Sequence, residues 1–269
     1  MFWTRGSAYM GVKAKVSAAI LVFIVAASLL APLFYHYSPH RIDLDHIKTS
    51  PGFSHLFGTD QEGRDVLARV LEGAKISIGV SLLAAISAMV IGLAVGVVSG
   101  YAGGKVDTAL MAFVDLILAF PSLLLAIGIS VVLPPGMFTV MIAIAAVGWA
   151  SFARLTRGYV LGIRDAQYVE AARAIGCGRY RVLFAHILPQ CMPLALTMLT
   201  LKIGGFIITE ASLSFLGLGA QPPVATWGGM ISSGRAYLET APWISVFPGI
   251  AIALTTFCFN ALGDALAKN

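Results

Sequence analysis

Charge is scarce in this chain. Only 12% of the 269 residues are Asp, Glu, Lys or Arg, about half the charged fraction of an ordinary soluble domain. Five long runs contain no charged residue: 76–104, 116–153, 182–201, 211–234 and 240–263. A run of about 20 apolar residues spans a bilayer as a helix, because lipid offers no hydrogen bonds to the backbone. The sequence therefore excludes a soluble protein and predicts an integral membrane protein.

Signals for chemistry on a substrate are also missing. The three cysteines, at 177, 191 and 258, are far apart and have no metal-ligand spacing, so we expect small apolar fillers. Four of the five histidines lie in or near one polar loop, at positions 36, 40, 46 and 55. Their irregular spacing predicts solvated side chains rather than a metal site. Gly103-Gly104-Lys105 lacks the earlier Gly and the following Ser or Thr of a phosphate-binding loop. We therefore predict no catalytic residue, cofactor or metal in this chain.

The apolar runs predict an all-α membrane protein with six transmembrane helices. These are expected at roughly 16–36, 76–99, 108–133, 137–157, 190–216 and 241–263. Pro134-Pro135-Gly136 divides the longest charge-free run. The first run follows basic residues, so a cleaved signal peptide is the alternative. Its length exceeds the usual 7–15 residues of a signal core and no small-x-small site follows, which favours an uncleaved helix.

Basic residues predict the orientation. The expected inner segments hold 11 Lys and Arg residues and the outer segments hold six, with Lys202 left inside a span. Because cytoplasmic loops are enriched in Lys and Arg, we expect both termini in the cytoplasm of a bacterial inner membrane protein. The same rule accounts for the net charge of +5 without a nucleic-acid partner. The predicted segments are a cytoplasmic N-terminus (1–15), a first helix (16–36), a periplasmic loop (37–75), a five-helix core (76–264) with a polar loop (158–189), and a cytoplasmic C-terminus (265–269).

The end of the periplasmic loop has a helical pattern. Gly58-Thr59-Asp60 and the acidic residues after it suit a helix N-terminus. Val66, Leu67, Val70, Leu71 and Ala74 then share one face. The pattern predicts an amphipathic helix at the outer membrane surface, and a solvated connector remains the alternative.

The polar loop 158–189 also has a helical pattern. Gly176-Cys177-Gly178 should end its first helix, because glycine is unfavourable in a helix interior. A second short helix is expected at about 179–186, and Leu188-Pro189 then leads into the fifth span. Ala171 and Ala172 permit close approach of a partner, and three arginines, at 173, 179 and 181, surround them. The loop is predicted to bind a partner protein, with anionic lipid heads as the alternative.

Several strings together resemble a known family. Glu170-Ala171-Ala172, then Gly176 and Ile187-Leu188-Pro189, resemble the EAA signature of ABC importer permeases. Further matches are Gly58-Thr59-Asp60, Gly63-Arg64-Asp65, Asp115 with Phe120-Pro121, the segment 210–219 (EASLSFLGLG), Trp227-Gly228, Pro248-Gly249, and Asn260 with Leu262-Gly263-Asp264. The set resembles the "C" permease of dipeptide, oligopeptide and nickel importers over about residues 38–267.

The resemblance implies a type I ABC importer permease fold in which the EAA loop forms coupling helices. These would dock on two ATP-binding cassette subunits, which bind ATP and Mg and hydrolyse ATP, so this chain would be no enzyme. The expected coupling residues are Glu170, Ala171, Ala172, Arg173, Gly176, Arg179, Leu188 and Pro189. A second, homologous permease would complete the translocation path, an extracytoplasmic substrate-binding protein would deliver cargo, and membrane lipid would surround the pair.

Three charged residues lie within predicted spans. Asp115, Lys202 and Glu210 are costly there, about 2.5–3.5 kcal/mol each. Lys202 and Glu210 are eight residues apart, so we expect them to share a helix face about 12 Å apart. They line the translocation path, or they pair with neighbouring helices or the partner permease. Glu210, inside a family string, has a structural role as a further alternative, and the role of Lys202 stays open.

Substrate and driving force leave alternatives. Peptides are the first expectation, followed by nickel or nickel chelates. A secondary transporter driven by an ion gradient, with Asp115 and Glu210 as ion sites, is the alternative class. It predicts transport that survives ATP depletion. An intramembrane enzyme ranks last, because no nucleophile and base lie together in the spans.

Overall fold

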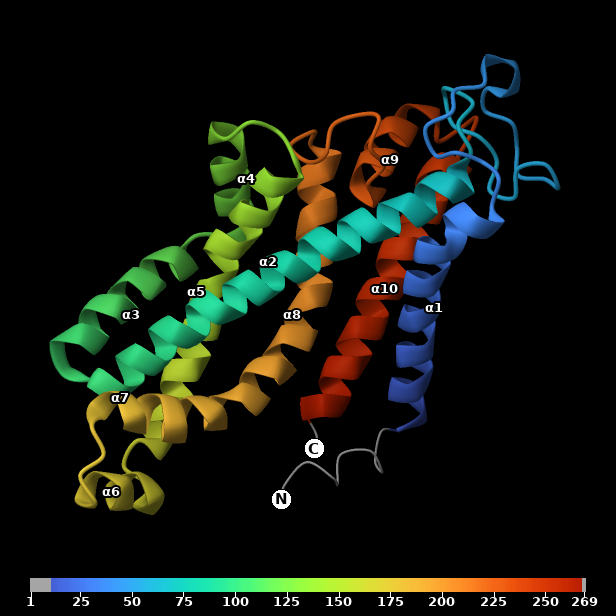
Figure 1. Ribbon diagram of the computed structural model, residues 1–269. Helices are drawn as coiled ribbons and strands as arrows, with labels where there is room; N and C mark the ends of the chain where they lie inside the picture. Colours follow the sequence, from blue (N-terminus) through green and yellow to red (C-terminus); the bar gives the residue numbers. More distant parts are fainter. Residues whose placement is uncertain (1–10, 268–269) are drawn as a thin grey trace.

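The computed structural model describes residues 11–267, and within them it is built from helices (Figure 1). The longer helices are α1 (Val12–Phe34), α2 (Val66–Ala102), α3 (Gly104–Ala119), α4 (Ser122–Val132), α5 (Met137–Ile163), α8 (Leu188–Phe215) and α10 (Trp243–Ala267). The short ones are α6 (Gln167–Ala174), α7 (Arg179–Val182) and α9 (Trp227–Gly234), with single turns at Leu44–His46 and Arg235–Tyr237 and a π-turn at Leu183–Ile187.

Five helices in the described residues are long and apolar enough to span a membrane, or up to six if the bent pair α3–α4 counts as one span. The predicted straight span 108–133 is wrong, because α3 and α4 meet at 91°. Phe120 is extended there, with φ −89° and ψ 144°. Proline disfavours a helical conformation in the residue before it, so Pro121 accounts for the break.

The second span is longer than predicted. α2 is 37 residues long and begins at Val66, where the Asp65 side chain accepts a hydrogen bond from the Ala68 amide. Val66 and Val70 are buried. The amphipathic surface helix and the solvated connector are therefore both wrong for this segment, which forms the first turns of the spanning helix.

A line of glycines joins α2 to α5. A Cβ at Gly92 or Gly96 would lie 2.5 Å from the carbonyl oxygen of Trp149 or Ala153, respectively. At Gly100 it would lie 3.0 Å from the carbonyl oxygen of Arg157. The constant register shows that the two helices run parallel at backbone contact, as small residues four apart permit. The sequence analysis missed this spacing.

The fifth span also extends beyond its prediction. The helical segment Arg179–Phe215 is 37 residues long and passes through the π-turn without a gap. The expected break between a short helix and the span at Leu188-Pro189 is therefore absent. Pro189 lies in the first turn of α8, where proline needs no amide partner.

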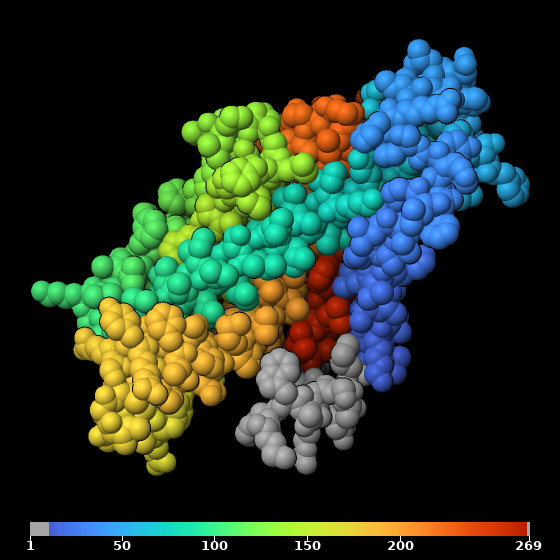
Figure 2. Space-filling view, in the orientation of Figure 1, coloured from blue at the N-terminus to red at the C-terminus, as the bar shows by residue number. Residues whose placement is uncertain are grey.

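The two ends of the helical body differ (Figure 1). α6, the start of α1 and the end of α10 lie at one end, and the loop between α1 and α2 lies with α9 at the other. The α6–α7 segment protrudes from the body (Figure 2). The predicted terminal segments 1–15 and 265–269 lie partly outside the described residues, as do Arg5 and Lys268 of the orientation argument.

Candidate coupling site

The protruding segment is anchored by one face of α6. α5 ends at Ile163, and the chain turns through residues 164–166 before α6 begins, so the helical pattern of the polar loop belongs to two helices. Val169 and Ala172 are 0% and 4% exposed and join the same core cluster as Val160 of α5. Ala172 is therefore covered by its own chain, and the expectation that it meets a partner is wrong.

The other face of α6 is open. Glu170, Ala171, Arg173 and Ala174 are exposed, and Glu170 forms no ion pair with another residue of the described 11–267. An exposed carboxylate in the first turn of a helix is favourable to the helix itself. It is also free to meet a cation from outside.

Gly176 ends α6 at the predicted position. Its φ is +87°, a left-handed conformation that glycine adopts without steric cost. The Cys177 amide donates to the Ala172 carbonyl at 3.0 Å, and the Gly176 amide to Arg173 at 3.0 Å. This is the Schellman arrangement, which satisfies the last carbonyls of a helix.

The three arginines of this loop have different surroundings. The Arg173 guanidinium lies over the Tyr101 ring of α2, 5.5 Å from its centroid, and donates to the Arg164 carbonyl at 3.2 Å. Arg164 in turn donates to the Gly100 carbonyl at 3.3 Å. Arg179 and Arg181 are exposed and form no ion pair within the described residues. Arg173 therefore ties α6 to the end of α2, whereas the other two are available.

Exposed apolar side chains accompany these arginines. Ile175, Tyr180 and Phe184 are 82%, 81% and 62% exposed. A cavity of about 580 Å³, lined in part by Tyr101 and Cys177, lies between them and the end of α2. Farther along, Leu188 is half-buried and Pro189 is exposed. Apolar and arginine side chains exposed together are typical of a protein-docking surface.

The charged residues of the spans are not brought together. Asp115 forms an ion pair with Arg154 of α5, and both side chains are exposed. Lys202 lines a cavity of about 300 Å³ with Phe120, Phe206 and Thr209.

Glu210 is buried instead, 2% exposed, and accepts a 2.7 Å hydrogen bond from Ser214. It lies on the α8 face that buries Ile203 and Ile207. The expectation that Lys202 and Glu210 share a face is therefore wrong.

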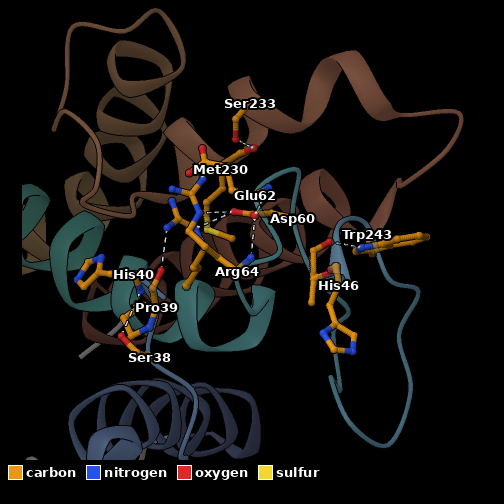
Figure 3. A network of polar contacts seen from close by, with 12 residues as sticks. Ser38, Pro39, His40, His46, Asp60, Glu62, Arg64, Met230, Ser233 and Trp243 are labelled. Carbon is orange, nitrogen blue, oxygen red and sulfur yellow. Dashed lines mark hydrogen bonds and ion pairs between the residues drawn. The ribbon is translucent and has the colours of Figure 1, made fainter. Parts of the chain in front are cut away.

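A second polar cluster lies at the opposite end, where the loop before α2 folds (Figure 3). Asp60 accepts from Arg64 Nε at 2.7 Å, and Arg69 donates to the Pro39 carbonyl at 2.9 Å. All but Pro39 are less than 9% exposed. Trp243 of α10 donates to the Thr59 carbonyl at 3.0 Å and fastens the loop to the last helix.

Asp65 is the centre of a neighbouring group. It accepts from Tyr35 at 3.0 Å and lies 2.9 Å from His55 Nδ1. Burial and the Asp65 carboxylate raise the pKa of the Tyr35 phenol. His55 is only 8% exposed, so the prediction of a solvated histidine is wrong there. Across the described 11–267, no group of three His, Cys, Asp or Glu residues could hold a metal.

The bent α3–α4 pair and the protruding loop after α5 define a permease of the ABC importer class, with the type I fold. A solved relative in fold is an inward-facing MetNI methionine ABC transporter, with a TM-score of 0.58 and 18% identity. The match covers 75% of this chain and 96% of that one.

The chain belongs to the family of binding-protein-dependent transport system inner membrane components, whose model matches residues 88–269. It is 41% identical to the oligopeptide transport system permease protein OppC of Bacillus subtilis, over 94% of this chain and 83% of that protein. It is 37% identical to the glutathione transport system permease protein GsiD of Pectobacterium atrosepticum, over 98% and 88%. It is 38% identical to the dipeptide transport system permease protein DppC of Alkalihalophilus pseudofirmus, over 94% and 83%.

Proposed function

We propose that this permease carries short peptides inward through a path that it shares with a second, homologous permease. The observation that carries the proposal is 41% identity to an oligopeptide permease over 94% of the chain. Relatives named for dipeptides and glutathione favour peptides over nickel as well. An extracytoplasmic binding protein would deliver the peptide.

Energy would enter through the open face of α6. Glu170, Ala171 and the exposed Arg179 would contact an ATP-binding cassette subunit, while Arg173 and Gly176 would fix the angle of α6. Leu188 and Pro189 would carry the movement into α8. ATP and Mg would be bound and hydrolysed by the two partner ATPases, and this chain would hold no cofactor. This role places α6, and with it both chain termini, in the cytoplasm.

The exposed Asp115–Arg154 pair suggests which face meets the second permease. A charged pair facing lipid is costly, so this face of α3 and α5 would be covered by the partner or would line water in the path. Lys202 would line the path from its cavity beside the α3–α4 break. Glu210, hydrogen-bonded inside its own chain, would have a structural role.

The docking role is tested by reversing one charge. Glu170→Lys is expected to reduce co-purification of the ATPase subunits and peptide uptake severalfold, because it opposes the partner that accepts Glu170. Glu239→Lys is the matched control, since Glu239 is also exposed and lies at the other end of the molecule. Gly176→Pro is a second variant, because proline cannot adopt the φ of +87°. Full association and uptake in both variants would overturn the docking role.

The energy source is tested separately in proteoliposomes that hold the whole importer. Uptake of a labelled peptide should require ATP inside the cytoplasmic-facing compartment and should persist when an ionophore collapses ion gradients. Uptake that survives ATP removal and stops with the ionophore would instead establish the secondary transporter.

A further inference from the structure

A cavity of about 410 Å³ lies between the end of α1 and the first turns of α2. Ser28, Pro32 and Tyr35 line it from the α1 side, and Glu72 and Lys75 from α2. The connecting segment closes it, because Arg69 holds the Pro39 carbonyl and His40 Nε2 lies 3.0 Å from Glu72 Oε1. The walls are therefore fixed by contacts outside the cavity.

Opposite charges in this cavity lack partners. The Glu72 Oε2 atom is buried without a hydrogen-bond partner in the described residues. Lys75 forms no ion pair there, with Glu72 or with any other residue of the described 11–267. Pro32 has no amide hydrogen for the Ser28 carbonyl four residues earlier, which adds an acceptor. Buried polar atoms are normally paired, so the cavity is suited to a ligand with both an N–H donor and an anion.

The depth of the cavity indicates where that ligand comes from. α1 has 23 residues, about 34 Å at 1.5 Å per residue, which is close to the ~30 Å hydrocarbon core of a bilayer. Its last residue, Phe34, therefore lies at the polar edge of the membrane. Tyr35 and Tyr37, which both line the cavity, are residues typical of that depth.

We propose that this cavity binds the head group of an ethanolamine phospholipid. The primary ammonium donates to Glu72 Oε2 and the Ser28 carbonyl, and the phosphodiester accepts from Lys75. A choline head group has no N–H to donate, and a glycerol head group has no cation for Glu72. The site lies at the membrane face opposite the coupling site, which is the outer leaflet in the proposed orientation.

The test measures lipid retained by the intact importer. The complex is purified from nanodiscs holding equal amounts of ethanolamine, choline and glycerol phospholipids with the same acyl chains, and native mass spectrometry counts the bound lipids. Wild type should retain the ethanolamine lipid about tenfold over the choline lipid, as expected of one charge-assisted hydrogen bond. Glu72→Gln should remove that preference, and Lys75→Gln should lower retention of all three lipids.

Two controls separate this site from surface charge. Arg41→Gln and Asp45→Asn change the same charges at exposed positions of the same loop, and both should retain lipid as wild type does. Soluble glycerophosphoethanolamine should compete only weakly, because it lacks acyl chains. Should it displace the lipid completely at low concentration, a free phosphoester would be the ligand and the lipid proposal would be overturned.

Equal retention of ethanolamine and choline lipids by wild type would also overturn the proposal, as would unchanged retention in both cavity variants. If a variant does not assemble, wild type alone decides the question. Its melting temperature should be higher in ethanolamine than in choline nanodiscs, and equal values would reject the site. These outcomes do not depend on whether the importer carries peptides.

Discussion

At one end of the molecule, the loop before α2 has little regular helix and yet buries Asp60 and Arg64. At the other end, α6 and α7 are helical and yet expose Glu170, Ile175 and Arg179. The first segment satisfies its charges within the chain, and the second leaves them open. Regular secondary structure therefore does not indicate which end is complete. The end with unpaired charge and exposed apolar surface is the one that needs a partner.

The largest expected effect is the loss of the buried ion pair. Asp60→Ala leaves Arg64 and Arg69 without their shared carboxylate. Removing one partner of a buried pair costs about 3–5 kcal/mol, so the melting temperature and membrane abundance of the permease should fall sharply. Asp45→Ala, at an exposed site in the same loop, is the control. Similar melting in the two variants would contradict the internal role of the network.

Two glycines with the same backbone conformation compare the ends directly. Gly63 has φ +73° and Gly176 has φ +87°. A Cβ at Gly63 would lie 1.7 Å from the Asp43 carbonyl oxygen, whereas nothing lies within 4 Å of one at Gly176. Left-handed backbone alone costs about 1–2 kcal/mol with a side chain, and the collision should raise this to about 3 kcal/mol for Gly63→Ala.

Thermal unfolding of the two glycine variants in the same detergent checks this difference. Gly176→Ala should melt only slightly below wild type, and its cost should appear in ATPase association. An equal loss of melting temperature at both positions would show that backbone strain alone governs them.

A smaller effect separates two arginines of the coupling site. Arg173→Gln removes the contact with Tyr101 and should cost about 0.5–1 kcal/mol, because an exposed cation–π contact is worth no more. Arg179→Gln should leave the melting temperature unchanged and weaken ATPase binding. If Arg179→Gln is the more destabilising of the two by thermal melting, the assignment of these arginines is reversed.

The smallest expected effect is a pH dependence in the outer loop. The hydrogen bond with His46 lowers the pKa of the exposed Asp43 carboxyl below its ordinary value of 3.8. A lowered folded-state pKa contributes stability that is present above the ordinary value and lost as the pH falls through the lowered one. Melting of wild type and Asp43→Asn should therefore differ slightly at pH 7 and converge below pH 4. A difference that grows on acidification would contradict this.

The spans were predictable because apolar runs and the bilayer thickness are local properties. The turn at Gly176 was predictable for the same reason, since glycine determines it within a few residues. The 91° break at Phe120-Pro121 was missed because the apolar run continues through it. The four-residue spacing of Gly92, Gly96 and Gly100 was a signal for close helix packing that the sequence analysis did not use.

The outer network could not be derived from spacing. Asp65 meets Tyr35 across 30 residues, and Thr59 meets Trp243 across 184. No local pattern specifies such contacts. The different roles of Arg173 and Arg179 were hidden for a related reason, because only the fold brings Tyr101 beneath the first of them.

The parallel contact of α2 with α5 has a mechanical consequence. α2 is about 55 Å long at 1.5 Å per residue, and it begins in the buried network and ends beside the coupling site. With Gly92, Gly96 and Gly100 seated against the α5 backbone, the two helices behave as one beam. A push on α6 would therefore tilt this beam and swing the outer loop, so that a power stroke at one membrane face is delivered as leverage at the other.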